Sequence, residues 1–210
     1  MDGSHLEVNL HVITAASVHI NNIYKAIARA GFEVVEFVYG ILSLGENIIT
    51  QEEKDIGCIL IDLSGLSTGI VIYLDGAIQS SMEIDFGSDL VTNDLANYLK
   101  TLPRVAKVIK EKHGIAAKEL LTDKEAQVKI PYLANDGRTT REVKKQDILT
   151  PISSRVEWYV EQLAGTITDE LQKHNCSTDM FSAGIVLTGG GSQLKGIDSV
   201  FSKGLNTTAR

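Results

Sequence analysis

In the first fifty residues, the spacing of apolar side chains changes from every second position to every third or fourth position. Residues 6–14 alternate apolar and polar positions, which predicts a strand. Residues 17–30 carry apolar side chains every three or four positions between Ser17 and Gly31, which predicts a helix with a serine N-cap and a glycine after its last turn. By the same criteria we expect a short strand at 32–38 and a helix at 41–49.

Residues 57–86 have the pattern of three consecutive antiparallel strands. An apolar run at 57–61 ends in Asp62, a loop of small residues follows, and a second apolar run returns at 70–74. Asp75-Gly76 is a strong signal for a two-residue hairpin turn, so a third strand is expected from about 77 to 86.

The remainder of the chain predicts further helices and short strands. The helical segments are 90–100, 103–113, 147–173 and 192–203, and the strands are 127–130, 139–143 and 184–188. The strands CILIDL and GIVLT are almost wholly apolar, so we expect a mixed sheet with helices on both faces, supplied by 90–113 and 192–203. Residues 115–174, which begin with a more polar stretch, should form a smaller α+β subdomain.

Composition limits the possible classes of function. The chain has 210 residues, 43% of them hydrophobic, and its formal net charge of −7 argues against a nucleic-acid-binding protein, which normally carries a basic face. Cys58 and Cys176 have no metal or disulfide spacing and indicate reduced thiols of a cytosolic protein. No apolar run approaches the ~20 residues that cross a bilayer, and the start lacks the features of a signal peptide.

Two stretches have the composition of nucleotide-binding loops. The hairpin after Asp62 continues Leu-Ser-Gly-Leu-Ser-Thr, whose glycine and small residues allow backbone N–H groups to form an anion-binding nest. Gly189-Gly190-Gly191 lies between an apolar strand and a helix predicted to start at Ser192, where backbone and helix N-terminus can approach a ligand. Each loop alone is only moderately specific, and their order in the chain is what points to a nucleotide.

This order resembles the actin-like ATPase superfamily, in which the hairpin would be the second phosphate motif and the triple glycine the adenosine motif. The resemblance narrows to the bacterial FtsA family, because four segments follow in its order and spacing: EVNLHVIT, DGAIQSSMEIDFGSDLVTNDLANYL, QVKIPYLANDGRTTREVKKQDILTPISSRVEW and GIVLTGGGSQLKGI. VTNDLA and REVKKQDILTPISSRVE favour FtsA over its relatives MreB and PilM. The resemblance covers nearly the whole chain and implies an α/β, actin-like (ribonuclease H-like) ATPase fold.

The resemblance implies four parts. They are a strip of the first lobe at 1–50, a second-lobe core with the phosphate hairpin at 51–114, the smaller α+β subdomain with the long helix at 115–174, and the second-lobe core with the adenosine motif at 175–210. The family's first phosphate hairpin and its extra subdomain would precede Met1, and its C-terminal amphipathic membrane helix would follow Arg210. The chain would therefore represent mainly the second lobe.

The resemblance also implies ligands and partners. The expected cofactor is ATP with Mg, held by Asp62, Gly65, Ser67, Thr68, Gly87, Lys110, Gly189, Gly190 and Gly191, with Asp62 reaching the metal through water. The FtsZ C-terminal peptide would dock near Arg155, and copies would self-associate into filaments. No nucleic acid and no catalytic residue is expected. The full-length protein would be cytoplasmic and peripheral at the inner face of the cell membrane, through segments outside this chain.

Three nucleotide-facing segments depart from the family pattern. The hairpin usually reads Asp-x-Gly-Gly-Gly-Thr-Thr, and here Leu66 stands where a glycine could adopt positive φ freely. The acid that usually contacts ribose, three residues before a lysine, is Lys107 here, with Lys110 as the lysine. Tyr39 stands where a carboxylate could orient attacking water. Two interpretations follow: a weakened or lost nucleotide site, or an adapted one that still binds.

Different classes of function share this fold. The first hypothesis is an adaptor that links FtsZ filaments to the division machinery, with nucleotide as a structural ligand. The second is an active ATPase or small-molecule kinase, although a sugar kinase would not be expected to carry VTNDLA and REVKKQDI. The sequence does not decide whether the protein is an enzyme. A DnaK-type chaperone is disfavoured, because no β-rich peptide-binding domain follows the triple glycine.

Overall fold

The computed structural model of the chain describes residues 8 and 10–210. Its centre is a four-stranded mixed sheet in the order β3-β2-β1-β6, built from β1 (Cys58–Leu63), β2 (Thr68–Leu74), β3 (Ala77–Ile84) and β6 (Gly184–Thr188). β1 runs antiparallel to β2 and parallel to β6, so the expected mixed sheet is confirmed. The turn between β2 and β3 is the predicted two-residue hairpin, with φ of 53° at Asp75 and 75° at Gly76.

Alternate side chains of β1 enter two separate apolar cores. Ile59, Ile61 and Leu63 pack in the core formed with α7 (Lys145–Lys173) and α8 (Ile197–Leu205). Cys58 and Leu60 belong to the core on the other face, together with side chains of α2 (Gly40–Ile48). The sheet is therefore covered on both faces, as its apolar strands require.

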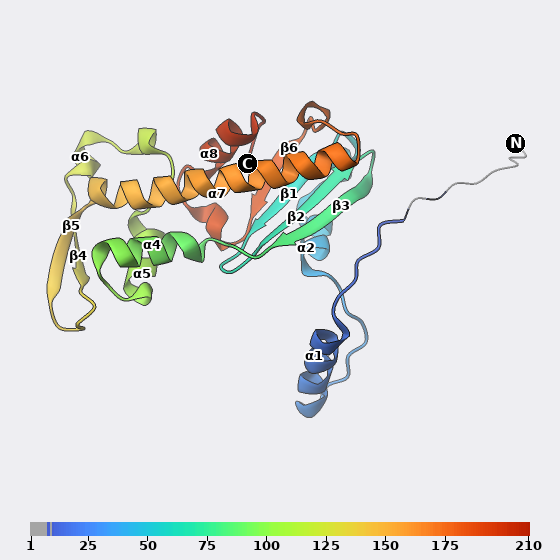
Figure 1. Ribbon diagram of the computed structural model, residues 1–210, viewed down its shortest axis with the longest axis horizontal. Helices are drawn as coiled ribbons and strands as arrows, with labels where there is room; N and C mark the ends of the chain where they lie inside the picture. The colour runs from blue at the N-terminus through green and yellow to red at the C-terminus, as the bar shows by residue number, and fades with distance from the viewer. Residues whose placement is uncertain (1–7, 9) are drawn as a thin grey trace, which may run out of the picture.

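The helices that cover the sheet are not all the expected ones. α4 (Asp89–Leu99) and α5 (Pro103–His113) pack mainly on each other, with α4 against α7 and α5 against β4. Figure 1 shows them beside the smaller sheet, whereas α7 crosses the main sheet and continues to the smaller one. The expectation that 90–113 flanks the main sheet is thus wrong, because the long helix α7 already occupies that face.

The smaller sheet is an antiparallel hairpin of β4 (Lys129–Leu133) and β5 (Thr140–Lys144). These strands begin two residues and one residue later than the strands expected at 127–130 and 139–143. Short helical segments complete this region and the loop before β6: α6 (Asp123–Ala126), η1 (Lys118–Leu120) and η2 (Thr178–Met180). The described helices include none long and apolar enough to cross a membrane. The division of the chain at 50, 114 and 174 stays a prediction.

The start of the chain differs most from its sequence pattern. α1 (Ser17–Arg29) forms, and Gly31 follows it with φ of 87°, but the N-cap is Ala16 rather than Ser17. Residues 10–16 and 32–38 form no strand, and the rest of the strand predicted at 6–14 lies largely outside the described residues. A strand needs a neighbour for its backbone groups, and within the described residues no strand pairs with either segment.

The triple glycine also leads into a different structure from the one expected. Residues Gly190–Gln193 form a short 3₁₀ turn, η3, and α8 begins only at Ile197. Leu194 is extended, with φ of −68° and ψ of 121°, and ends the turn, and Gly196, with φ of 79°, is the N-cap of α8. The predicted start of this helix at Ser192 is therefore wrong. A further short segment, α3 (Gln51–Asp55), begins at a capping box formed by Thr50 and Glu53.

Candidate functional site

The two loops singled out in the sequence meet at one edge of the main sheet. β1 and β6 are parallel neighbours, and Asp62 pairs with Thr188, so Asp62 and Gly189 lie side by side. A Cβ at Gly189 would be 2.3 Å from Asp62 Oδ1 and 2.7 Å from the carbonyl oxygen of Leu63. The backbone of Gly189, with φ of 83°, approaches the carboxylate this closely only because it carries no side chain.

Residues 64–67, which we call the phosphate loop, are held from two sides. Ser64 Oγ donates to Asp62 Oδ2 at 3.2 Å. The N–H groups of Ser88 and Asp89 donate to the carbonyls of Ser64 and Gly65, both at 2.9 Å. Gly87 permits this approach, since a Cβ there would be 2.4 Å from the Gly65 carbonyl oxygen. The loop is thus fixed on the first residues of α4.

Leu66 does not strain the phosphate loop. Its side chain is 81% exposed, and no residue from 64 to 67 has a positive φ. The conformational restriction expected of leucine at this position therefore does not arise in this backbone conformation. Asp62, Gly65 and Ser67 are each partly exposed, so all three can be reached by a ligand from the loop side.

Thr68 is the predicted ligand residue that the structure places elsewhere. It is fully buried, its Oγ1 donates to the Phe86 carbonyl at 2.7 Å, and the same oxygen is hydrogen-bonded to the hydroxyl of Tyr159. Both hydrogen bonds point into the protein. Thr68 therefore fixes the base of the hairpin and offers no hydroxyl to a ligand.

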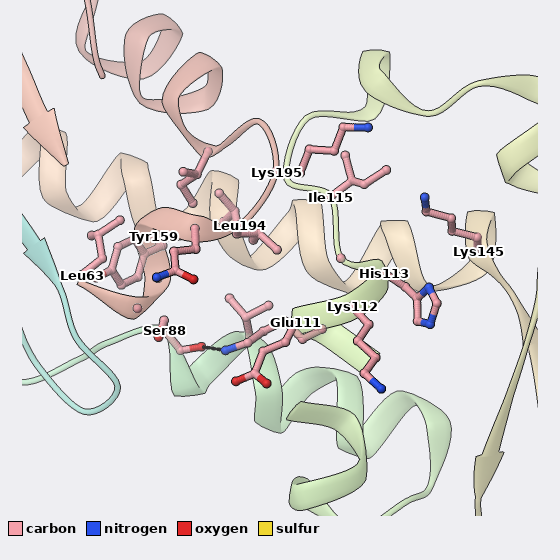
Figure 2. A pocket seen from close by; sticks show the side chains of 18 residues that line it. Leu63, Ser88, Glu111, Lys112, His113, Ile115, Lys145, Tyr159, Leu194 and Lys195 are labelled. Carbon is pink, nitrogen blue, oxygen red and sulfur yellow. Dashed lines mark hydrogen bonds between the residues drawn. The ribbon is translucent and has the colours of Figure 1, made fainter. Parts of the chain in front are cut away.

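A cavity of about 420 Å³ adjoins the phosphate loop. It lies between the end of α5, the middle of α7 and η3, and Figure 2 shows Tyr159 and Ser88 on one side and His113 and Lys145 on the other. The lining includes the expected residues Lys110, Gly190 and Gly191. Its volume falls in the range of small-molecule sites.

Cationic side chains dominate this cavity. Lys110 Nζ donates to the carbonyl of Ser88 at 3.2 Å, and burial lowers the pKa of its ammonium, with Asp89 and Glu111 opposing that shift. Burial also lowers the pKa of His113, and the charges of Lys145 and Lys112 act in the same direction. Lys145 is paired with Glu125 at 2.8 Å, which leaves Lys110 as the cation nearest the phosphate loop.

Glu111 is the carboxylate that sequence reasoning missed. It lines the cavity, whereas Lys107 does not and instead pairs at 4.0 Å with Glu111 from the exposed side of α5. The position assigned to a lost ribose acid thus lies outside the cavity lining, and an acid one helical turn later lines the cavity instead. The signal was available, because residues four apart share a helix face.

Tyr39 is also outside the cavity lining. It caps the start of α2 and packs on the apolar core of the opposite sheet face. Burial, and secondarily the charge of Glu83, raises the pKa of its hydroxyl. Among the described residues, no group of three or more His, Cys, Asp or Glu side chains could hold a metal ion. A metal near Asp62 would therefore need water and ligand oxygens to complete its shell.

Arg155 lies on α7, in a separate surface cluster. Its Nε donates to Asp94 Oδ2 at 2.5 Å, and its guanidinium lies 4.8 Å from the ring centre of Trp158. Trp158 in turn contacts Phe86, with ring centres 5.5 Å apart. Since Nε binds Asp94, the terminal nitrogens remain available as hydrogen-bond donors.

The comparisons decide the family. The family model described as "Cell division protein FtsA" matches residues 59–210. The chain belongs to the FtsA family. It is 34% identical over 200 residues to the cell division protein FtsA of Neisseria meningitidis serogroup B, covering 94% of this chain and 46% of that protein. The FtsA of Escherichia coli K12 is 28% identical over 217 residues, covering 100% of this chain and 50% of its own length. The chain thus spans about half the length of these relatives.

Solved structures confirm the actin-like fold. MreB 5 of Spiroplasma citri bound to AMPPNP superimposes with a TM-score of 0.69 at 16% identity, over 93% of this chain and 60% of that one. A chain of the MamK double helical filament gives a TM-score of 0.57 at 16% identity, over 73% of this chain and 48% of that one. At these sequence identities the structural similarity shows the fold of this chain alone.

Proposed function

We propose that this chain is the nucleotide-binding half of an actin-fold adaptor that links FtsZ filaments to the division machinery at the membrane. The observation that carries the proposal is the junction of Asp62, the phosphate loop and the cavity in a chain of the FtsA family. Nucleotide acts in this proposal as a structural ligand, and turnover is not part of it.

The residues present fit an adenine nucleotide with Mg. Gly190, Gly191 and Glu111 line the cavity and would hold the base and ribose, with the Glu111 carboxylate as an acceptor for the ribose hydroxyls. The phosphate loop would hold the phosphates, and Asp62 would hold the metal through water. Mg supplies charge neutralisation between the phosphate oxygens when it is bound. In support, MreB 5 of Spiroplasma citri has been solved with AMPPNP and with ADP.

The proposed partners are the FtsZ C-terminal peptide and further copies of the protein. The peptide binds near Arg155, whose free guanidinium nitrogens suit a carboxylate. Trp158, 37% exposed beside it, adds an apolar surface to the same patch. Filament formation by the actin-like relative MamK supports self-association. Location at the inner face of the cell membrane is proposed for the full-length protein.

Titration with Mg-ATP tests the nucleotide part of this proposal. The resemblance to the superfamily implies two phosphate hairpins and the described residues contain one, so we expect a dissociation constant no tighter than about 1 mM, near −4 kcal/mol. Isothermal titration calorimetry gives the affinity, and a phosphate-release assay should show no hydrolysis. A micromolar constant would show that the single hairpin suffices, and no binding at millimolar ATP would remove the nucleotide from the proposal.

A further inference from the structure

Residues 86–89, which we call the collar, connect the cavity to the phosphate loop. The collar's Ser88 and Asp89 N–H groups donate to carbonyls of the phosphate loop. From the other side, its Ser88 carbonyl accepts from Lys110, and its Phe86 carbonyl accepts from Thr68. The shape of the phosphate loop therefore depends on what holds the collar.

Tyr159 is the buried side chain that completes this arrangement. It lines the cavity, as Figure 2 shows, and is only 4% exposed. Its hydroxyl is hydrogen-bonded to Thr68 Oγ1. Its ring makes an edge-to-face contact with the ring of Phe86, with ring centres 5.1 Å apart. Tyr159 thus touches the cavity and both residues that join the collar to the hairpin.

The direction of these hydrogen bonds follows from the number of protons. A threonine hydroxyl has one proton, and Thr68 gives it to the Phe86 carbonyl, which can only accept. The Tyr159 hydroxyl must therefore donate to Thr68. Burial raises the pKa of Tyr159 to about 12, which keeps this donor protonated at neutral pH. The resulting chain of hydrogen bonds runs from the Tyr159 hydroxyl through the Thr68 hydroxyl to the Phe86 carbonyl of the collar.

We propose that Tyr159 is a positioning residue, which holds the phosphate loop in register with the nucleoside cavity through Thr68 and the collar. The inference rests on the proposed nucleotide function, which it deepens by naming a residue that joins the two halves of the site. Tyr159 acts here through Thr68 and does not contact phosphate.

Tyr159→Phe tests the inference because it removes the hydroxyl and keeps the ring in the cavity wall. We expect ATP affinity to fall about 2- to 10-fold, the effect of one hydrogen bond, while adenosine affinity stays within about twofold. Thr68→Val, which removes the hydroxyl, should lower ATP affinity by a similar factor, whereas Thr68→Ser, which keeps it, should leave ATP affinity unchanged. The double variant Tyr159→Phe/Thr68→Val should lose no more ATP affinity than either single variant. Chemical-shift titration by NMR measures both ligands at millimolar concentration.

Hydrogen exchange without ligand provides a second readout. Ser88 and Asp89 should exchange their amide protons several times faster in Tyr159→Phe, because these amides hold the phosphate loop. Tyr132→Phe is the matched control, since Tyr132 donates to the Leu99 carbonyl at 3.2 Å in the smaller sheet region and should leave both amides unchanged.

The outcomes separate the possible failures. Equal loss of ATP and adenosine affinity, or unchanged exchange at Ser88 and Asp89, would show that Tyr159 is only a wall of the cavity and overturn the inference. If the unmodified chain binds neither ATP nor adenosine, the proposed function fails. The exchange comparison then still decides whether Tyr159 positions the loop.

Discussion

The two loops that meet at the ends of β1 and β6 keep their shapes by different means. The phosphate loop is held by hydrogen bonds from Ser88 and Asp89, and it accommodates the side chains of Ser64 and Leu66. The triple-glycine loop is held by close contact: Gly189 lies against Asp62, and a Cβ at position 191 would be 2.9 Å from Leu63 Cβ. Departure from the glycine pattern therefore has little consequence at Leu66 and a large one at Gly189 and Gly191.

The largest expected effect is that of Gly189→Ala. The backbone there has φ of 83° and ψ of 172°, a region that only glycine occupies readily, and the new methyl group would overlap Asp62 Oδ1. We expect a loss of about 3 kcal/mol in the free energy of unfolding, measured by urea denaturation.

Gly190→Ala is the control for this substitution in the neighbouring residue. Nothing lies within 4 Å of a Cβ at Gly190, and its φ is not positive, so stability should change by less than about 0.5 kcal/mol. Equal effects at the two positions would show that close contact does not hold this loop.

Arg155→Ala is expected to have the next largest effect, on a surface outside both loops. Loss of a charged hydrogen bond should weaken binding of the FtsZ C-terminal peptide by roughly 1–3 kcal/mol in fluorescence polarisation. ATP affinity should not change. Arg141→Ala, an exposed arginine of β5, controls for the altered net charge. Unchanged peptide affinity would count against this docking site.

The sequence predicted the main sheet correctly because its strands pair with one another inside the described chain. CILIDL and GIVLT became β1 and β6, and Asp75-Gly76 made the expected turn. Residues 32–38 have a comparable apolar content, yet Val35 is 94% exposed and no strand forms. Periodicity describes which face a strand would bury, but only a neighbouring strand satisfies its backbone.

The site was predictable as a set of loops and less so residue by residue. The loops that contain Asp62 and Gly189 lie together because the carboxyl ends of parallel strands meet at one edge of a sheet, and Lys110 lines the adjoining cavity. That these residues bind a nucleotide stays a prediction. Thr68 and Lys107 were assigned by motif position alone. Thr68 is turned inward by its hydrogen bond to Tyr159, and the cavity lies beside Glu111, one helical turn beyond Lys107; a linear motif specifies neither.

A smaller effect is expected from Glu111→Gln, which tests the cavity that adjoins the two loops. Because Glu111 is exposed at the cavity rim, loss of its charge should weaken adenosine binding by roughly 1 kcal/mol, about fivefold. 2′-Deoxyadenosine should be affected less, since it lacks one of the hydroxyls that Glu111 would accept from. Glu142→Gln, at an exposed glutamate of β5 outside the cavity lining, should alter the affinity for neither ligand. Identical losses for the two nucleosides would contradict the ribose contact.

The smallest effect is expected from Leu66→Gly, which restores a glycine of the family pattern. If the missing glycines had disabled the phosphate loop, this change would tighten ATP binding strongly. The hydrogen bonds from Ser88 and Asp89 and the solvent-exposed position of Leu66 argue otherwise. Since no loop residue needs a positive φ, the glycine adds only freedom to the unfolded chain, at a cost of about 0.4–1 kcal/mol in stability. ATP affinity should change less than twofold by calorimetry, and a tenfold gain would show that the loop must change conformation to bind phosphate.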